Sequence, residues 1–135
     1  MSHISKIDTK IKNLNFLKKA LETLGMEYIE ASENAPLTLQ GYGKGEEIEN
    51  CIFEIKTGSK YSIGIRRKEE NYEFVADWWA IETFTGLKQD EILNKITRQY
   101  AYETIMDKVK DLGYSVVQEE EDTKNNIRLT VRRWG

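Results

Sequence analysis

The alternation of apolar and polar residues divides the chain into a first helix, a long run of strands, a second helical segment and two final strands. In the first helical segment, leucines recur at spacings of three, four and three residues: Leu14, Leu17, Leu21 and Leu24. This spacing places the leucines on one stripe of a helix. Asn13 stands where an N-cap residue would accept a backbone hydrogen bond, and Gly25 stands where a left-handed C-cap residue is needed. We therefore predict a helix between these two residues.

Much of the N-terminal half shows the period of two that is typical of half-buried strands. We predict single strands over residues 5–11, 27–31 and 37–40. From residue 47 to residue 79, alternating apolar residues are separated by short polar turns, which predicts an antiparallel meander of three strands. In this interpretation the last of these strands extends through Trp78 and Trp79.

A second helical segment covers residues 88–112, but its apolar face changes along its length. The apolar residues of its first half lie on one side, and those of its second half lie on nearly the opposite side. We predict a break near residues 98–100, which would give a short helix followed by a longer one. A single helix that is covered on two sides is the alternative. Strands over residues 114–118 and 127–131, joined by a charged turn, complete the chain.

Runs of consecutive strands flanked by helices favour the α+β class over a parallel sheet. We predict a single antiparallel sheet of six to seven strands with two to three helices packed on one face. The length of 135 residues fits one domain over residues 1–135, and a chain of this size can bury a core without disulfides or metals. The other face of the sheet would then be partly open, or covered by loops or by a second chain.

The presence of one cysteine and one histidine restricts the chemistry of the chain. A single cysteine excludes an intramolecular disulfide, and one cysteine with one histidine excludes a four-ligand zinc site built from these residue types. No apolar run approaches the roughly 18 residues that a membrane-spanning helix needs. The first residues also lack the apolar region of a secretory signal. We expect a soluble, cytoplasmic protein without a metal, a cofactor or a membrane contact.

Three segments of the chain resemble one known family. They are the opening Met1-Ser2-His3-Ile4-Ser5-Lys6-Ile7, the internal Arg98-Gln99-Tyr100-Ala101-Tyr102, and the closing Ile127-Arg128-Leu129-Thr130-Val131-Arg132-Arg133-Trp134. They are similar to the hypothetical chloroplast reading frame thirty-five family, a domain of unknown function found in algal plastids, cyanobacteria and other bacteria. The resemblance spans essentially the whole chain, although Ile4 stands where members usually have Phe. It implies a small α+β protein of the cytosol or stroma, and it supplies no activity, substrate or cofactor.

His3 and Cys51 belong to residue types that often serve in catalysis. No carboxylate or cysteine partner stands near His3 in the sequence, so we interpret it as a polar residue that ties the first strand to a neighbour. Cys51 lies on the apolar side of a predicted strand. We expect it in the core, where a thiol behaves as a small hydrophobic group.

Asp77 and the sequence Gly41-Tyr42-Gly43-Lys44-Gly45 each allow a functional and a structural interpretation. A carboxylate beside Trp78 could act as a general acid, but no second carboxylate is paired with it, so a hydrogen-bonded residue at a strand end is favoured. The glycines superficially resemble a phosphate-binding loop. A strand pattern follows them, however, whereas phosphate loops lead into a helix. We predict a flexible hairpin connection there.

The pair Trp78-Trp79 is the most informative local feature of the sequence. Adjacent residues of a strand point to opposite faces, so one of the two would leave the core. That side chain would face a partner or a ligand, because exposed tryptophan is typical of interaction surfaces. Alternatively, the connection over residues 79–88 covers the second face of the sheet.

Basic and aromatic residues also share one face of the last predicted strand, at Arg128, Arg132 and Trp134. Such a face could stack bases and contact phosphates, as in sheet-based RNA readers. The net charge of −3 and the acidic residues 119–122 argue against nucleic acid. Pairing of arginine with glutamate across a hairpin is the simpler explanation.

We therefore predict a non-catalytic binding module that docks to another protein or associates with itself. Its expected surface consists of aromatic and basic residues: Trp78, Trp79, Tyr100, Tyr102, Arg128, Arg132 and Trp134. One alternative is a small-molecule pocket between helices and sheet, lined by Tyr100, Tyr102, Trp78 and Asp77. A surface for single-stranded nucleic acid is the other. An enzyme is the least favoured interpretation, since one His and one Cys provide no nucleophile–base pair, although a site built from carboxylates alone stays open.

Overall fold

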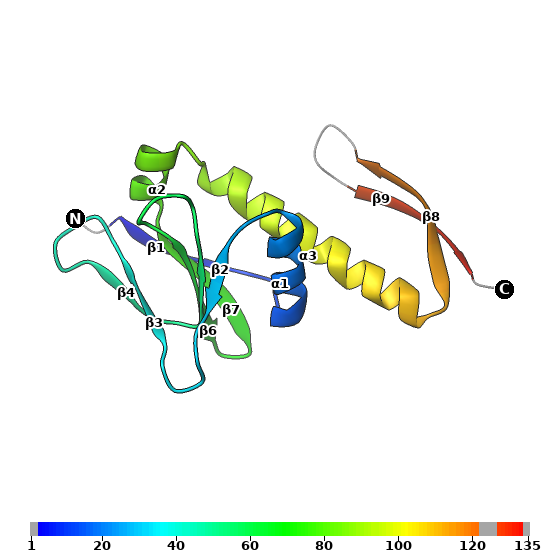
Figure 1. The fold of residues 1–135 in the computed structure, drawn as a ribbon, viewed down its shortest axis with the longest axis horizontal. Helices are drawn as coiled ribbons and strands as arrows, with labels where there is room; N and C mark the ends of the chain where they lie inside the picture. The colour runs from blue at the N-terminus through cyan, green and yellow to red at the C-terminus, as the bar shows by residue number, and fades with distance from the viewer. Residues whose placement is uncertain (1–2, 122–126, 134–135) are drawn as a thin grey trace.

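The computed structural model describes residues 3–121 and 127–133 of the chain (Figure 1). Its elements in chain order are β1 (Ile4–Asp8), α1 (Leu14–Thr23), β2 (Tyr28–Glu30), β3 (Leu37–Gln40), β4 (Glu47–Cys51), β5 (Phe53–Ile55), β6 (Ile63–Lys68), β7 (Asn71–Asp77), α2 (Trp78–Thr85), α3 (Gln89–Asp111), β8 (Tyr114–Glu121) and β9 (Ile127–Arg133). Within the described ranges, no helix is both long and apolar enough to cross a bilayer.

Five strands form one antiparallel sheet in the order β1-β7-β6-β5-β2, while β3–β4 and β8–β9 form two-stranded sheets of their own. The α+β class and the antiparallel pairing are thus confirmed. The described strands are divided among three sheets, however, where the sequence predicts a single sheet of six to seven strands. One division lies between β4 and β5, at Ile52, shortly after Asn50 with its φ of 62°. As a result β4 pairs with β3, whereas β5 pairs with β2 and β6.

The helices share one core with a single face of the five-stranded sheet. Phe53, Ile65 and Phe74 of the sheet are buried together with residues from all three helices. The opposite face is covered in part by the β3–β4 hairpin, because Leu39, Ile48 and Cys51 form a second, smaller core with Val75. The β3–β4 hairpin therefore covers part of the sheet face that we predict to be partly open or covered by loops.

Helix α1 has the two caps that the sequence predicts. The Asn13 side chain accepts a hydrogen bond from the Asn15 backbone at 2.8 Å. At the other end Gly25 adopts a φ of 71°, and the Met26 N–H donates to the Leu21 carbonyl at 2.9 Å. These bonds satisfy amides and carbonyls that a helix end would otherwise leave unpaired. They also direct the chain from α1 into β2.

Strand β7 ends at Asp77, two residues earlier than the sequence predicts, and this changes the position of both adjacent tryptophans. Trp78 and Trp79 begin helix α2, and the side chain of Asp77 caps this helix by accepting from the Ala80 N–H at 3.0 Å. The prediction of a strand through Trp79 is therefore wrong. An aspartate followed by four apolar residues is compatible with a strand or with a capped helix, and here the cap decides between them.

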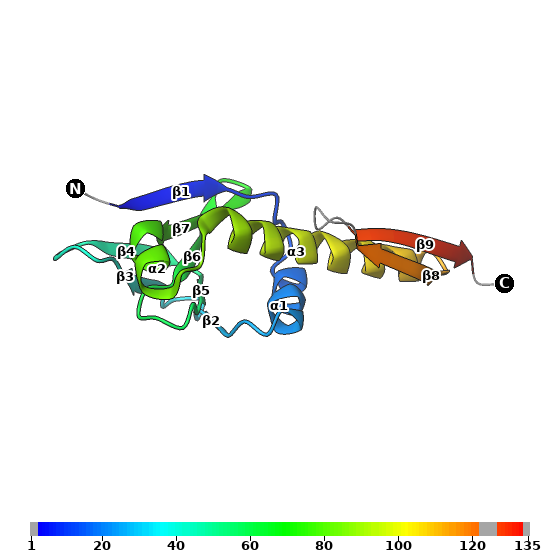
Figure 2. The same cartoon turned by 90° about the horizontal axis from the view of Figure 1, so that it is seen from above.

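Helix α3 is continuous from Gln89 to Asp111, where the sequence predicts a break. Its first half buries Ile92, Leu93 and Ile96 in the core. Its second half extends past the sheet (Figures 1 and 2), and between residues 101 and 112 no side chain is buried. The apolar face changes because the neighbours of the helix change. The backbone needs no break, since a helix satisfies its own hydrogen bonds.

The β8–β9 hairpin lies at the far end of α3, apart from the five-stranded sheet (Figures 1 and 2). Both final strands are confirmed, and β8 extends to Glu121. Their register places Glu120 opposite Arg128 and Ser115 opposite Arg132. The backbone register therefore places a glutamate opposite an arginine, as the sequence predicts for this hairpin. Asp122 and Trp134 lie outside the described residues.

Candidate functional site

Three large aromatic side chains meet at the surface beside β1 and α2. Tyr42, Trp79 and Phe84 are 52%, 41% and 55% exposed. The ring centroids of Tyr42 and Trp79 are 4.7 Å apart in an edge-on arrangement, and those of Tyr42 and Phe84 are 6.1 Å apart. Both separations lie in the range at which aromatic rings attract one another. We call these three residues the aromatic surface.

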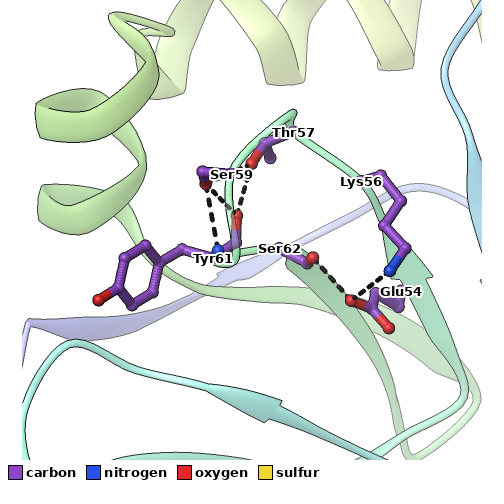
Figure 3. A network of polar contacts seen from close by, with 6 residues as sticks. All are labelled: Glu54, Lys56, Thr57, Ser59, Tyr61 and Ser62. Carbon is purple, nitrogen blue, oxygen red and sulfur yellow. Dashed lines mark hydrogen bonds and ion pairs between the residues drawn. The ribbon is translucent and has the colours of Figure 1, made fainter.

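The aromatic surface lies on a buried ring whose position is fixed. Tyr61 is buried and stacks against Phe84 at 5.4 Å. Its backbone is held by the β5–β6 turn, as Figure 3 shows: the Tyr61 carbonyl accepts from the hydroxyls of Thr57 and Ser59, and the Tyr61 N–H donates to the Ser59 Oγ at 3.1 Å. The neighbouring Ser62 hydroxyl donates to the Glu54 carboxylate at 2.7 Å. Phe84 thus stacks on a residue whose backbone is held by several hydrogen bonds.

Asp77 brings together the two segments that carry the exposed rings. Its Oδ1 caps α2 through Ala80, and its Oδ2 accepts from the Tyr42 N–H at 2.9 Å. The residue is buried. Because both carboxylate oxygens accept from backbone amides, the side chain has a structural role, which agrees with the interpretation favoured from the sequence. It sets the position of Tyr42 relative to Trp79.

The glycine-rich connection that carries Tyr42 joins β3 to β4 and is a hairpin loop, as predicted. The Gly41 N–H donates to the Glu46 carbonyl at 2.8 Å, and the Glu46 N–H donates to the Gly43 carbonyl at 3.0 Å. A Cβ at Gly41 would lie 2.7 Å from the Glu46 carbonyl oxygen. The loop therefore closes only because this position lacks a side chain, and its closure presents Tyr42 outward.

His3 and Trp78 lie next to the aromatic surface and have different environments. The imidazole of His3 stacks on Trp79, with the ring centroids 5.0 Å apart. This ring is the neighbour that His3 contacts at the start of β1. Trp78 is buried in the main core. The Trp78 Nε1 is buried and has no hydrogen-bond partner among the described residues.

The structure separates the other residues that the sequence assigns to a binding surface. The Tyr100 hydroxyl accepts from the Lys12 and Asn13 amides at 3.0 and 3.1 Å and so fixes the start of α1. Tyr102 lines a groove beside α3. Arg128 and Arg132 belong to β9, at the opposite end of the molecule from α2.

The pocket predicted between helices and sheet does not assemble from the four residues expected to line it. Of Tyr100, Tyr102, Trp78 and Asp77, only Tyr102 lines the groove beside α3. This groove runs between α3, the α1–β2 corner and the β5–β6 turn, and its volume is about 1710 Å³. It exceeds the roughly 300–1,000 Å³ that is usual for small-molecule sites.

Sequence reasoning found Trp79 but missed Tyr42 and Phe84. Tyr42 is surrounded by glycines in a loop, and Phe84 lies in a segment that was interpreted as a connection. Exposure of a ring cannot be read from residue type alone. The capping signal at Asp77 could have identified α2. Trp79 and Phe84 are five residues apart on this helix, however, so they lie on different faces and meet only through Tyr42.

Cys51 lies in the smaller core, beneath the β3–β4 hairpin. Burial raises the pKa of the Cys51 thiol to about 11, so the thiol stays protonated and is a poor nucleophile. This agrees with the core position expected for Cys51. Among the described residues, no group of three or more His, Cys, Asp or Glu side chains could hold a metal ion.

Comparison with known proteins identifies a family whose description names no activity. A family model described as "Protein of unknown function (DUF1257)" matches residues 20–130. The chain is 31% identical to the "Uncharacterized protein ycf35" of Cyanophora paradoxa, over 99% of this chain and 98% of the relative. The proteins of the same name from Guillardia theta and Pyropia yezoensis are 33% and 31% identical over the same shares. No solved structure matches the chain.

Proposed function

This chain belongs to the family of proteins of unknown function that includes the ycf35 proteins of algal plastids, and we propose that it acts as a non-catalytic protein-binding module. The observation that carries the proposal is the aromatic surface. Tyr42, Trp79 and Phe84 are exposed together although they come from two distant segments. Tryptophan and tyrosine are the residue types that most often dominate the energy of protein interfaces.

The contacts that hold the aromatic surface in place support a binding role. Asp77 fixes the backbone of Tyr42, and the β5–β6 turn fixes Tyr61 beneath Phe84. Side chains that are already ordered lose little conformational entropy when a partner covers them. A partner would therefore gain the burial of three rings at a small ordering cost.

A protein partner is favoured over nucleic acid by the charge of the chain. Surfaces that stack nucleic-acid bases combine aromatic rings with a positively charged track for the phosphates. The chain has a net charge of −3, which opposes binding to a polyanion. Aromatic rings without a basic track are typical of protein interfaces.

We expect Trp79→Ala and Phe84→Ala each to weaken partner binding by about 30-fold or more, because an interface centred on these rings loses about 2 kcal/mol per ring. Both side chains are about half exposed, so the thermal midpoint should move by no more than about 4 °C. The chain is first used to capture proteins from nuclease-treated lysate of its own organism. The captured partner is then purified, and its affinity for each variant is measured by calorimetry.

The matched control is Ile29→Ala. Ile29 is exposed to the same extent as Trp79, but it lies on β2, at the other edge of the five-stranded sheet from β1. This variant should bind the partner like the wild type. Unchanged affinity of both aromatic variants would contradict the proposal. A wild-type chain that retains no protein in stoichiometric amount would contradict it as well.

A further inference from the structure

We propose that the groove beside α3 binds an acidic amphipathic helix of another protein. The groove has a volume of about 1710 Å³, and residues from Glu91 to Ile105 of α3 line one side of it. At a rise of 1.5 Å per residue, this stretch of α3 is about 21 Å long, the length of about four helical turns. A site of this size suits a peptide segment, since pockets for small molecules usually measure roughly 300–1,000 Å³.

Basic residues outnumber acidic residues along the groove, although the whole chain has a net charge of −3. The acidic residues that line it are Glu27 and Glu91. The basic residues that line it are Lys56, Lys88, Lys95 and Arg98. Opposite charges across an interface steer a partner to its site, and like charges reject the wrong one. The sign of the charge in the groove therefore favours an acidic partner.

The positive charge is concentrated in the middle of the groove. At the start of α3, Lys88 lines a small hollow together with Glu82, Asp90 and Glu91, whose negative charges outnumber it. Lys95 is exposed instead, and it forms no ion pair with another residue in the part of the chain that the structure describes. A carboxylate of a bound helix can pair with Lys95 without displacing a partner from this chain.

Apolar side chains line the groove between these charges. Ile92 is buried in the main core, and Leu24 and Met26 of the α1–β2 corner are half-buried against the same core. Ile105, at the far end of the groove, is 49% exposed. A partner helix with one apolar stripe can bury that stripe here and place carboxylates beside Lys95. Nucleic acid fits less well, because it has no such stripe and its phosphates would meet the two acidic residues of the groove.

The backbone across the groove from α3 favours a helical partner over an extended one. The Met26 N–H donates to the Leu21 carbonyl, and the Lys56 N–H donates to the Glu27 carbonyl, both at 2.9 Å. An extended peptide binds by adding backbone hydrogen bonds to a strand edge, and these amides are already occupied. A helix satisfies its own backbone and binds through side chains alone.

Selection from a random library tests the class of ligand without assuming its sequence. Phage-displayed peptides of about 15 residues, the length of about four turns, are selected on the full chain. Enriched sequences should include apolar residues at helical spacing combined with Asp or Glu. Circular dichroism should show that such a peptide becomes helical when it is bound. A selection that enriches no sequence of this kind would overturn the proposal.

Variants of the chain then show where a selected acidic peptide binds, with fluorescence anisotropy as the measurement. Lys95→Glu should raise the dissociation constant by about 10-fold or more, because it places like charges opposite one another. Lys110→Glu makes the same change at an exposed residue of α3 outside the groove, and it should bind like the wild type. Ile105→Ala should weaken binding by about 5-fold, and Ile29→Ala is its control.

Charge reversal in the peptide separates direct contact from a disturbed fold. A peptide with Lys in place of its acidic residues should bind Lys95→Glu more tightly than it binds the wild type. Added salt should weaken the binding of the acidic peptide to the wild type. Unchanged affinity of Lys95→Glu for the acidic peptide would overturn the proposal, as would tighter binding of a single-stranded oligonucleotide of equal charge. The groove is independent of the aromatic surface, so Trp79→Ala should bind the acidic peptide normally.

Discussion

The carboxylate of Asp77 joins the end of β7, the first turn of α2 and the loop that carries Tyr42. Each of its oxygens accepts from one backbone amide, and each bond has a different consequence. The bond to Ala80 starts a helix, whereas the bond to Tyr42 positions an exposed ring. Residue type and sequence position single out Asp77 as notable, but they cannot give it this role, because the second amide comes from a loop 35 residues earlier.

We expect Asp77→Ala to lower the free energy of unfolding by about 2–4 kcal/mol, since the variant loses a helix cap and leaves the Tyr42 amide without its acceptor. Asp77→Asn keeps one acceptor oxygen, and asparagine is as good a cap as aspartate. It should therefore retain most of the stability of α2 while losing the bond to Tyr42. Urea denaturation measures the stabilities, and partner binding reports the position of Tyr42. Equal stability of the alanine variant and the wild type would contradict this role.

Cys51 should make stability depend on pH in the alkaline range. Burial raises the pKa of its thiol from the ordinary value of 9.0 to about 11, so the folded state keeps the proton that the unfolded chain releases. Its stabilising contribution is complete below about pH 9 and is lost as the pH rises toward 11, by up to about 3 kcal/mol. The measurement is the difference in unfolding free energy between wild type and Cys51→Ala across this range. A difference that stays constant with pH would contradict the prediction.

The elements differ in how far local sequence determines them. Helix α1 is predicted correctly because its cap at Asn13, its leucine stripe and its terminal Gly25 are all local signals. Helix α2 is missed because its first residues, Trp78 to Ile81, form an apolar run that fits a strand equally well. The break predicted in α3 is wrong because the apolar pattern records which neighbours a helix has. It does not record whether the backbone continues.

The contact between β6 and the β3–β4 hairpin depends on the absence of a side chain at Gly64. A Cβ at this position would lie 2.6 Å from the Cys51 Sγ. Gly64→Ala should therefore lower the free energy of unfolding by about 1–3 kcal/mol through overpacking. In a Cys51→Ala background the sulfur is gone, so the same substitution should cost less by about 1 kcal/mol. Chemical denaturation of the four proteins gives this coupling, and purely additive effects would contradict it.

The whole molecule has two ends with different surfaces. The aromatic surface lies at the end formed by the sheet and α2, and the second half of α3 and the β8–β9 hairpin form the other end (Figure 1). The α+β class follows from the order of strands and helices in the sequence. The division into three sheets does not, because it depends on the bend between β4 and β5 and on which strands pair. The apolar residues Ile105 and Leu112 are visible in the sequence, but their exposure becomes clear only because α3 extends past the sheet.

The contact between His3 and Trp79 has a practical consequence for anyone who fuses a tag to this protein. A tag or fluorescent protein at the N-terminus is attached two residues before a ring that stacks on the aromatic surface. A fusion at the C-terminus instead follows β9, at the opposite end of the molecule from α2 (Figure 1). C-terminal fusions therefore suit partner capture. The end chosen for the fusion decides whether an experiment can report binding at the aromatic surface.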